Sequence, residues 1–258
     1  MYSNSPAFEN LQRFIAMFWQ KSVNLVLPPQ CISCRARLAE LGLCASCWCE
    51  LRFIEAPLCD RLGLPFDYDP GDGIVSAAAL AYPPSYARAR AVVHYDDVAR
   101  TLVHRFKYKD GLDAAPLLGA MMKRSGRDLF EGCDIVVPVP LYRSRLWLRR
   151  YNQAAVLAIE IARTTGLDYE PQLLDRVRKT RSQVGLNASQ RRRNVSGAFA
   201  INESAFERVA NKRILLIDDV ITTGATIEAC SKALLRGGAE AVNVLAFARV
   251  VDPLKLPI

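Results

Sequence analysis

Hydrophobic residues follow two alternating patterns in the second half of the chain, and these patterns predict strands and helices in turn. Short continuous apolar runs occupy residues 134–139, 213–217 and 241–249, which is typical of strands buried on both faces. Between the runs, residues 152–165 and 226–236 place apolar side chains at helical spacing, and a glycine follows each segment. Strands that alternate with helices predict βαβ units around a parallel sheet, and therefore an α/β fold.

The first half of the chain is less regular. Residues 8–21 predict an amphipathic helix that packs on its own protein, with binding to a membrane surface or a partner as the alternative. Residues 74–132 mix short strands and helices, and the chain shows no internal repeat. We therefore predict an amphipathic helix within residues 1–27, a cysteine-rich module at residues 28–70, and one α/β domain at residues 74–258.

Composition and charge narrow the class of protein. The chain has 258 residues, of which 51% are hydrophobic and 23% charged, as expected for a soluble protein. No apolar run approaches the length of a bilayer span and the N-terminus lacks the features of a signal peptide, so we expect a cytoplasmic protein without membrane insertion. The net charge of +8 is concentrated at residues 143–193. It fits phosphate metabolites and nucleic acid equally well.

The segment ILLIDDVITTGAT at residues 214–226 has the features of a loop that binds a sugar phosphate. The apolar strand delivers Asp218 and Asp219 to its carboxyl end, where ligands bind in open α/β sheets. Carboxylates beside a phosphate site suit ribose hydroxyls and Mg²⁺. A phosphate fits the hydroxyls and backbone of the turn, which opens a helix. The turn residues are Thr222, Thr223, Gly224, Ala225 and Thr226.

Other phosphate loops fit this segment less well. Gly224 is not followed by Lys-Ser/Thr, which excludes a Walker A loop, and the glycine pattern of dinucleotide folds is missing. An ordinary turn whose aspartates only cap the helix is the remaining alternative. All thirteen positions resemble the signature with which type I phosphoribosyltransferases bind phosphoribosyl diphosphate (PRPP). In purine-salvage members of that family an acidic general base stands at the place of Thr222, which cannot ionise, so purine salvage is disfavoured.

The resemblance to type I phosphoribosyltransferases also gives two basic segments an interpretation. Arginines after the first core strand suit the diphosphate of PRPP, although a solvated basic face is the alternative. Residues 179–199 stand where that family carries a lid over PRPP; an ordered exposed loop or a single-stranded nucleic acid site are the alternatives. The candidates for diphosphate and lid contacts are Arg143, Arg145, Arg149, Arg150 and Arg193.

Six of the eight cysteines fall between residues 31 and 59. Two CxxC pairs at tetrahedral zinc spacing, in a chain without an export signal, favour structural Zn²⁺ over disulfides. Redox activity and a metal-free module are the alternatives. The expected ligands are Cys31, Cys34, Cys44 and Cys47, and Cys59 can replace one of them.

Taken together, the blocks of this sequence resemble the ComF family over roughly residues 25–250. The resemblance rests on residues 106–109, 138–140, 149–153 and 193–199, Gln183, and the loop at 214–226, in that family's order. It implies a type I phosphoribosyltransferase-like parallel sheet flanked by helices, with a small N-terminal zinc-ribbon-like module. It also implies PRPP with Mg²⁺ as ligand and, in some bacteria, a part in DNA uptake during competence. The family often carries three CxxC pairs, but Leu62 ends the third one here, so one zinc site is expected.

Three functions follow from these features. The first is a phosphoribosyltransferase that acts on an unknown acceptor, with no catalytic residue assigned. The second is a non-catalytic factor that binds single-stranded DNA and retains a PRPP-binding fold. The third is an adaptor whose zinc module docks a partner such as a helicase.

Overall fold

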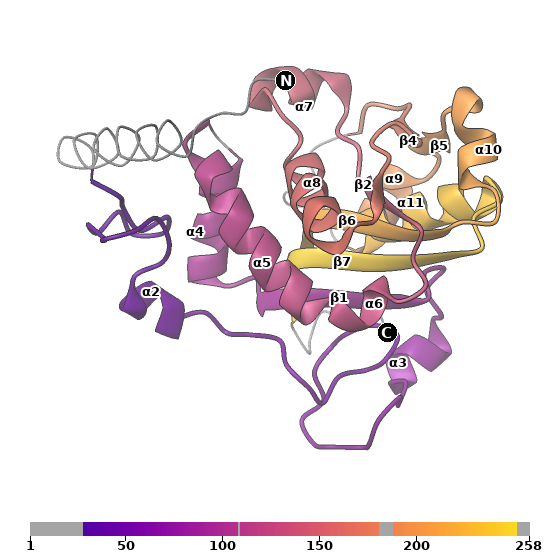
Figure 1. Cartoon of the computed structure of the whole chain (residues 1–258). Coiled ribbons are helices and arrows are strands. Elements are labelled where there is room, and N and C mark those ends of the chain that lie inside the picture. The colour runs from indigo at the N-terminus through magenta and orange to yellow at the C-terminus, as the bar shows by residue number, and fades with distance from the viewer. Residues whose placement is uncertain (1–27, 108, 181–187, 252–258) are drawn as a thin grey trace, which may run out of the picture. The chain divides into compact units, whose positions relative to one another are not determined.

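The structure is a computed structural model that describes residues 28–107, 109–180 and 188–251 (Figure 1). The chain divides into two compact units, Met1–Cys49 and Glu50–Ile258. The predicted amphipathic helix lies outside the described residues, and so does part of the predicted lid, at residues 181–187. In the first unit, the described residues contain one short helix, α2 (Ala45–Cys49).

The second unit is built on a parallel sheet of five strands in the order β1-β7-β6-β2-β3, which confirms the predicted α/β architecture. The three apolar runs form β2, β6 and β7, which lie side by side in the middle of the sheet. The strands are β1 (Arg88–His94), β2 (Ile135–Pro138), β3 (Asp168–Tyr169), β6 (Arg213–Ile221) and β7 (Ala241–Arg249).

Strand β6 continues four residues beyond the predicted end at residue 217. Its pairing with β7 runs through Asp218 opposite Ala246 to Ile221 opposite Arg249. Two adjacent carboxylates are unusual in a buried strand and suggest that a loop begins at Asp218. The backbone nevertheless keeps its hydrogen bonds to β7. Asp218 and Asp219 are therefore held by the sheet itself, which fixes their positions more firmly than a loop would.

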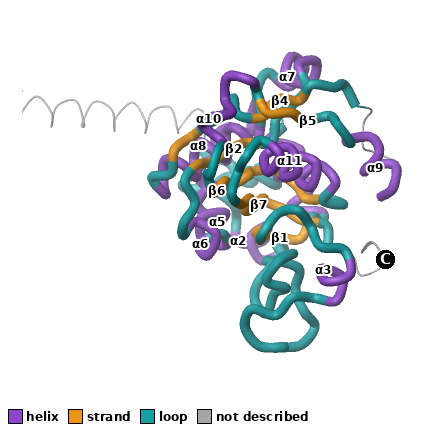
Figure 2. The backbone as a smooth tube through the Cα atoms, turned by 90° about the vertical axis from the view of Figure 1, so that its right-hand side faces the viewer, coloured by secondary structure: helices purple, strands orange, loops and turns teal. Residues whose placement is uncertain are grey.

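Helices cover both faces of this sheet (Figure 2). α5 and α8 pack together on one face, where α5 contacts β1 and β7, and α8 contacts β2 and β6. On the other face, α11 shares a buried cluster with Ile214 and Leu216 of β6. Alternation along the strand turns Leu215 and Ile217 toward α8, so that β6 is buried on both faces.

The helix bounds agree closely with the sequence pattern where the pattern is strong. α8 begins after Asn152, whose side chain accepts a hydrogen bond from the Ala154 amide, and ends at Gly166 in the left-handed conformation. The basic segment after β2 also forms a helix, α7, which the sequence did not predict. The helices of the sheet domain are α3 (Ala77–Ala81), α4 (Asp97–Phe106), α5 (Ala115–Ser125), α6 (Arg127–Phe130), α7 (Arg143–Arg149), α8 (Gln153–Thr165), α9 (Ala188–Val195), α10 (Phe206–Val209) and α11 (Ala225–Arg236), with 3₁₀ turns η1 (Lys109–Ala114) and η2 (Glu203–Ala205).

A small second sheet carries the segment predicted to be a lid. β4 (Leu174–Arg176) pairs antiparallel with β5 (Phe199–Ile201), and the amide of Val177 donates to the carbonyl of Ala198 at 2.9 Å. α9 lies between these two strands along the chain and contacts α11. The base of the predicted lid is thus an ordered hairpin of strands.

Strand β1 forms one edge of the main sheet, and residues before it cover that edge. The amide of Ile54 donates to the carbonyl of Val92 at 2.9 Å, and the amide of Ala89 donates to the carbonyl of Arg61 at 2.9 Å. Gly63 also lies against β1, at φ +64°. Covered edges do not offer unpaired backbone groups to other chains. Within the described residues, no helix is long and apolar enough to cross a bilayer.

We expect Gly63→Ala to destabilise the protein by about 3 kcal/mol. A Cβ atom at this position would lie 2.1 Å from the Ala89 carbonyl oxygen, so overpacking adds to the strain of a left-handed residue. Gly73→Ala is the matched control, because Gly73 has φ +70° and open space around it, and it should cost about 1 kcal/mol. Urea unfolding of both variants measures the difference; equal losses would contradict the close approach to β1.

Candidate functional site

A cavity of about 580 Å³ opens at the carboxyl end of the central strands. This volume lies within the range of small-ligand pockets. Five cationic side chains and two carboxylates line it together with the turn after β6, so its charge favours an anion. The polar lining residues are Tyr95, Lys107, Arg145, Arg149, Arg176, Arg191, Asp218, Asp219, Thr222 and Thr226.

The two aspartates predicted from the loop motif both line this cavity. The Asp218 carboxylate accepts a hydrogen bond from the Asp219 amide at 2.9 Å. Burial raises the pKa of Asp218 well above its usual range, and the adjacent charge of Asp219 adds to this effect. A carboxylate held in so unfavourable a place is typical of a binding or catalytic site.

Lys107 is a site residue that the motif analysis did not assign. Its Nζ atom lies 3.3 Å from the Asp219 carboxylate, and both side chains are largely buried. Lys107 follows directly after α4, far from the phosphate loop in sequence. Its block at residues 106–109 contributed to the family resemblance, but nothing in the pattern indicated a partner for it. Only the fold brings this cation to the aspartates.

The turn after β6 has the geometry of a phosphate cradle. Gly224 precedes α11 at φ +74°, with open space where a Cβ atom would stand. The first amides of a helix have no partner within the helix and point toward its N-terminal end. The Thr223 hydroxyl is buried without a hydrogen-bond partner among the described residues, and Thr222, Ala225 and Thr226 line the cavity. These donors fit a phosphate group.

The predicted diphosphate arginines divide into two groups. Arg145 and Arg149 of α7 line the cavity. Arg191 of α9 lines it too; it is not itself a predicted contact but belongs to the same basic run as the predicted Arg193. Arg143 and Arg150, from the same stretch as α7, and Arg193 of α9 are not among the residues that line it. Helical periodicity explains the division on α7. Arg145 and Arg149 are four residues apart and share one side of the helix, whereas Arg143 lies on another side.

Arg176 of β4 is a second cation that the sequence did not single out. Its guanidinium lies 5.2 Å from the centre of the Phe199 ring and faces the cavity. Burial lowers the pKa of Arg176, and the nearby charge of Arg145 lowers it further. Both effects disfavour the charged form of Arg176, so an anion bound in the cavity would stabilise it.

The stretch from Arg149 to Gln153 holds the cavity wall in place. Arg149 donates to the Gln153 side chain at 3.1 Å, and the Asn152 amide group donates to the Val139 carbonyl at 3.0 Å. The Tyr151 hydroxyl donates to the Phe106 carbonyl, one residue before Lys107. The block therefore links the end of β2 to the end of α4.

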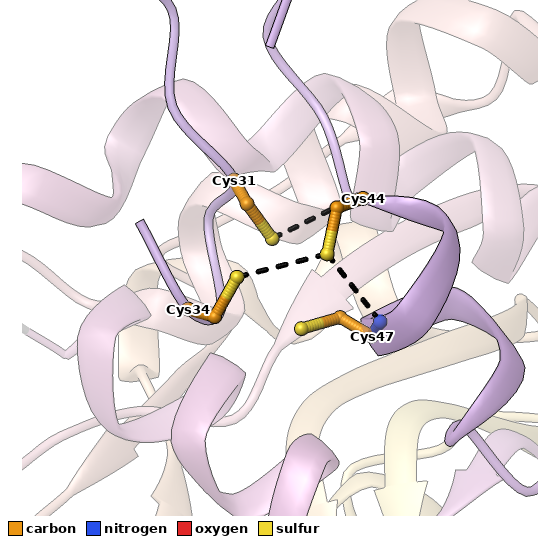
Figure 3. A group of neighbouring side chains, drawn as sticks. All are labelled: Cys31, Cys34, Cys44 and Cys47. Atoms are coloured by element: carbon orange, nitrogen blue, oxygen red, sulfur yellow. Dashed lines mark hydrogen bonds between the residues drawn. The ribbon is translucent and has the colours of Figure 1, made fainter. Parts of the chain in front are cut away.

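A separate site in the first unit consists of four cysteines (Figure 3). The sulfur atoms of Cys31, Cys34, Cys44 and Cys47 all lie within 4.8 Å of one another, and those of Cys34 and Cys44 are 3.6 Å apart. Four thiolates around tetrahedral zinc lie about 3.8 Å apart. The predicted ligand set is thus gathered in a geometry that fits zinc. None of the eight cysteines, all of them described, forms a disulfide.

Cys59, the predicted alternative ligand, belongs to the second unit and has its own environment. Its side chain is fully buried, and its sulfur accepts hydrogen bonds from the amides of Leu62 at 3.4 Å and Ser76 at 3.2 Å. The four-cysteine group is complete without it.

Two family models match the chain in the order in which these sites occur. A double zinc ribbon domain matches residues 22–80, and a phosphoribosyl transferase domain matches residues 150–255. The second match contains the loop at 214–226, and the first contains the four-cysteine group. Both models agree with the fold described above.

Several curated proteins are similar to this chain over most of its length. Competence protein F from Haemophilus influenzae is 32% identical over 227 residues, which cover 85% of this chain and 96% of that protein. DNA utilization protein YhgH from Salmonella typhimurium is 31% identical over 235 residues, 88% of this chain and 100% of that protein. Competence protein ComFC from Bacillus subtilis is 25% identical over 212 residues, with 80% and 82% covered.

Solved structures resemble a smaller part of this chain. The glutamine phosphoribosylpyrophosphate amidotransferase from B. subtilis is 23% identical, with a TM-score of 0.38, and the match covers 55% of this chain and 30% of that one. A score this low adds nothing about the site.

We expect Asp218→Asn to stabilise the ligand-free protein and raise its Tm by a few degrees. Folding raises the pKa of the Asp218 carboxyl group. Ionisation of this group therefore destabilises the folded protein, whereas the protonated group carries no such cost. The gain from asparagine should therefore be small near pH 4 and should grow as the pH rises through the raised pKa. Asp168→Asn, an exposed aspartate of β3, is the control. Thermal unfolding between pH 4 and pH 8 measures the effect, and a pH-independent gain would contradict it.

Proposed function

This chain belongs to the ComF family, whose members include competence protein F, and on that premise we propose that it binds PRPP with Mg²⁺ in the cavity at the end of β6. The observation that carries the proposal is the order of groups along one continuous segment. Two carboxylates lie near the C-terminal end of strand β6, a short threonine turn and a left-handed glycine follow the strand, and α11 begins directly after the glycine. This order places acceptors for ribose hydroxyls next to donors for a phosphate.

Each part of PRPP has partners in this arrangement. The ribose hydroxyls donate to Asp218 and Asp219, while the turn from Thr222 to Thr226 donates to the 5′-phosphate. Arg145 and Arg149 face the diphosphate, for which paired guanidinium donors are well suited. Mg²⁺ supplies charge neutralisation to the diphosphate when bound. Lys107 stabilises Asp219 in the absence of ligand.

The same groups suit transfer of the phosphoribosyl unit. In that reaction the bond from the ribose C1 to the diphosphate oxygen breaks, a bond from C1 to the acceptor forms, and the acceptor loses a proton. The cationic wall of Arg145, Arg149 and Arg176 would stabilise the departing diphosphate. Thr222 cannot take a proton from the acceptor, which disfavours purine bases. The acceptor and the catalytic residue stay open in this proposal.

Calorimetric titration of the full chain with PRPP and Mg²⁺ tests the binding site. We expect Asp218→Ala/Asp219→Ala to weaken binding about 100-fold or more, because each lost charge-assisted hydrogen bond contributes about 1.5–3 kcal/mol. Asp168→Ala/Asp175→Ala removes two exposed aspartates and should bind as the wild type does. Absence of heat with the wild type, or wild-type affinity in the Asp218/Asp219 variant, would sink the proposal.

A surface feature favours binding of single-stranded DNA as a second candidate function. Trp147 and Leu148 of α7 are 88% and 84% exposed, and arginines flank them in the sequence. Exposed aromatic rings among cations provide stacking surfaces for unpaired bases. Some relatives are named for DNA utilization and others for competence, which agrees with this candidate.

Binding of a fluorescent oligothymidine at several salt concentrations tests this second candidate. Trp147→Ala should weaken binding roughly tenfold, since stacking on one base contributes about 1–3 kcal/mol. Arg191→Ala/Arg192→Ala/Arg193→Ala should reduce the slope of log K against log salt by about 2. Lys123→Ala/Arg124→Ala/Arg127→Ala removes three exposed cations elsewhere and should leave the slope unchanged. A flat salt response, or equal effects of both triple variants, would count against DNA binding.

Two further assignments belong to this proposal. We place the protein in the cytoplasm, because a cluster of reduced thiols that can hold zinc suits a reducing compartment. Docking of a helicase through the four-cysteine module stays a prediction from the sequence.

A further inference from the structure

Two segments of the chain share one pattern of backbone hydrogen bonds. We name residues 29–49 the first ribbon and residues 57–81 the second ribbon. In the first ribbon, amides donate from Cys31 to Ala36 (2.8 Å), from Arg35 to Cys31 (2.9 Å) and from Leu38 to Pro29 (2.8 Å). In the second, they donate from Cys59 to Leu64 (2.8 Å), from Gly63 to Cys59 (2.7 Å) and from Phe66 to Pro57 (2.9 Å). Each bond recurs at an offset of 28 residues.

The second half of each ribbon, from Gly42 in the first and Ile74 in the second, repeats as well, now at an offset of 32 residues. The first ribbon has bonds from the Ile32 amide to the Gly42 carbonyl (2.9 Å) and from the Trp48 amide to the Cys44 carbonyl (2.9 Å). The second has bonds from Asp60 to Ile74 (2.8 Å) and from Leu80 to Ser76 (3.1 Å). A five-residue helix follows in both, α2 in one and α3 in the other. Four inserted residues between the two halves account for the change of offset.

Bonds to the side chains at the metal-ligand positions follow the same correspondence. The Cys31 sulfur accepts from the Cys44 amide at 3.3 Å, and the Cys59 sulfur accepts from the Ser76 amide at 3.2 Å. The Cys44 sulfur accepts from the Cys47 amide at 3.5 Å, and the Ser76 hydroxyl accepts from the Ala79 amide at 3.4 Å. The prediction that the chain has no internal repeat is therefore wrong for the backbone, although few side chains repeat.

We infer that the second ribbon is a metal-free copy of the first, in which Leu62, Ser76 and Ala79 occupy the places of three zinc ligands. The corresponding residues of the first ribbon are Cys34, Cys44 and Cys47. Cys59, which corresponds to Cys31, is the one thiol that remains. A single thiol cannot provide the four ligands of a structural zinc site. The double zinc ribbon that the family model describes thus holds one metal in this chain.

Contacts inside the second unit replace the missing metal. Leu62 packs against the main hydrophobic cluster, and Ala79 and Cys59 are buried. The Cys59 sulfur keeps two amide donors, and the Ser76 hydroxyl caps α3. Apolar packing and local hydrogen bonds thereby hold the shape that zinc holds in the first ribbon.

The second ribbon has also become part of the sheet. Three successive carbonyls of its first turn accept hydrogen bonds from the sheet. The donors are the Arg90 guanidinium to Asp60 (2.8 Å), the Ala89 amide to Arg61 (2.9 Å) and the Arg249 guanidinium to Leu62. The carboxylate of Asp60 pairs with Arg88 and Arg90 as well. The role of the second ribbon is to hold edge strand β1 without depending on metal.

Metal analysis of the full chain by mass spectrometry tests the count of sites. We expect one zinc per chain in the wild type, about one in Cys59→Ala and almost none in Cys34→Ser. Two zinc ions per wild-type chain would overturn the inference. Loss of zinc in Cys59→Ala would overturn it too, provided that circular dichroism shows that variant to be folded.

Restoring the ligands tests the correspondence of positions. Leu62→Cys/Ser76→Cys/Ala79→Cys should raise cobalt binding from one to two ions per chain, with the absorption of tetrahedral cobalt thiolate doubled. Leu62→Ser/Ala79→Ser makes comparable changes of size without thiolates, and should bind one ion. A folded triple-cysteine variant that binds only one cobalt ion would contradict the proposed positions.

Hydrogen exchange of the unmodified protein gives an answer that does not depend on any variant. After removal of metal by a chelator, the amides of Ile32, Arg35 and Leu38 should exchange much faster, while those of Asp60, Gly63 and Phe66 keep their protection. Loss of protection in both ribbons would refute a metal-free second ribbon.

Discussion

The burial of β6 on both faces is the constraint on which the rest of the second unit depends. Its side chains Ile214–Ile217 are inaccessible to solvent, and its backbone is paired with β2 on one side and β7 on the other. A strand so enclosed has no freedom in register, because a shift of one residue would exchange its two faces. Asp218 and Asp219 are therefore carried to a fixed place at the end of the sheet.

Two neighbouring, largely buried carboxylates are electrostatically unfavourable in that place, and nearby groups offset this cost only in part. Lys107 lies beside Asp219 and offsets its charge, while Asp218 is left with a raised pKa. Arginines from three other elements, α7, β4 and α9, also line the cavity. A cavity lined by both carboxylates and several arginines is organised for a ligand that carries both phosphate groups and hydroxyls. Such a site trades stability of the free protein for binding.

The edge strand β1 of the main sheet is protected by residues that precede it in the chain. An exposed parallel edge strand would leave backbone groups unpaired, and β1 is covered by residues 52–54 and by the first turn of the second ribbon. Gly63 is needed there because its neighbour β1 approaches too closely for any side chain, whereas the first ribbon accommodates Arg35 in the same left-handed conformation, at φ 66°. The second ribbon thus has the backbone shape of a zinc-binding ribbon with only one of the four ligand thiols, Cys59.

The sequence by itself determined the features that depend on neighbouring residues. Apolar runs marked the central strands, the spacing of Cys31, Cys34, Cys44 and Cys47 marked the four-thiol site, and the loop after β6 marked the phosphate turn. These signals are local, since they arise from periodicity, ligand spacing and turn chemistry.

Tertiary structure alone decided the features that join distant segments. It brought Lys107 and Arg176 to the cavity, selected Arg145 and Arg149 from a run of arginines, and revealed the second ribbon behind Cys59. Contacts of this kind depend on which strands pair and which way a helix faces. The second ribbon in particular repeats the backbone hydrogen bonds of the first, whereas in the sequence it shows only Cys59 and an incomplete CxxC pair that ends at Leu62.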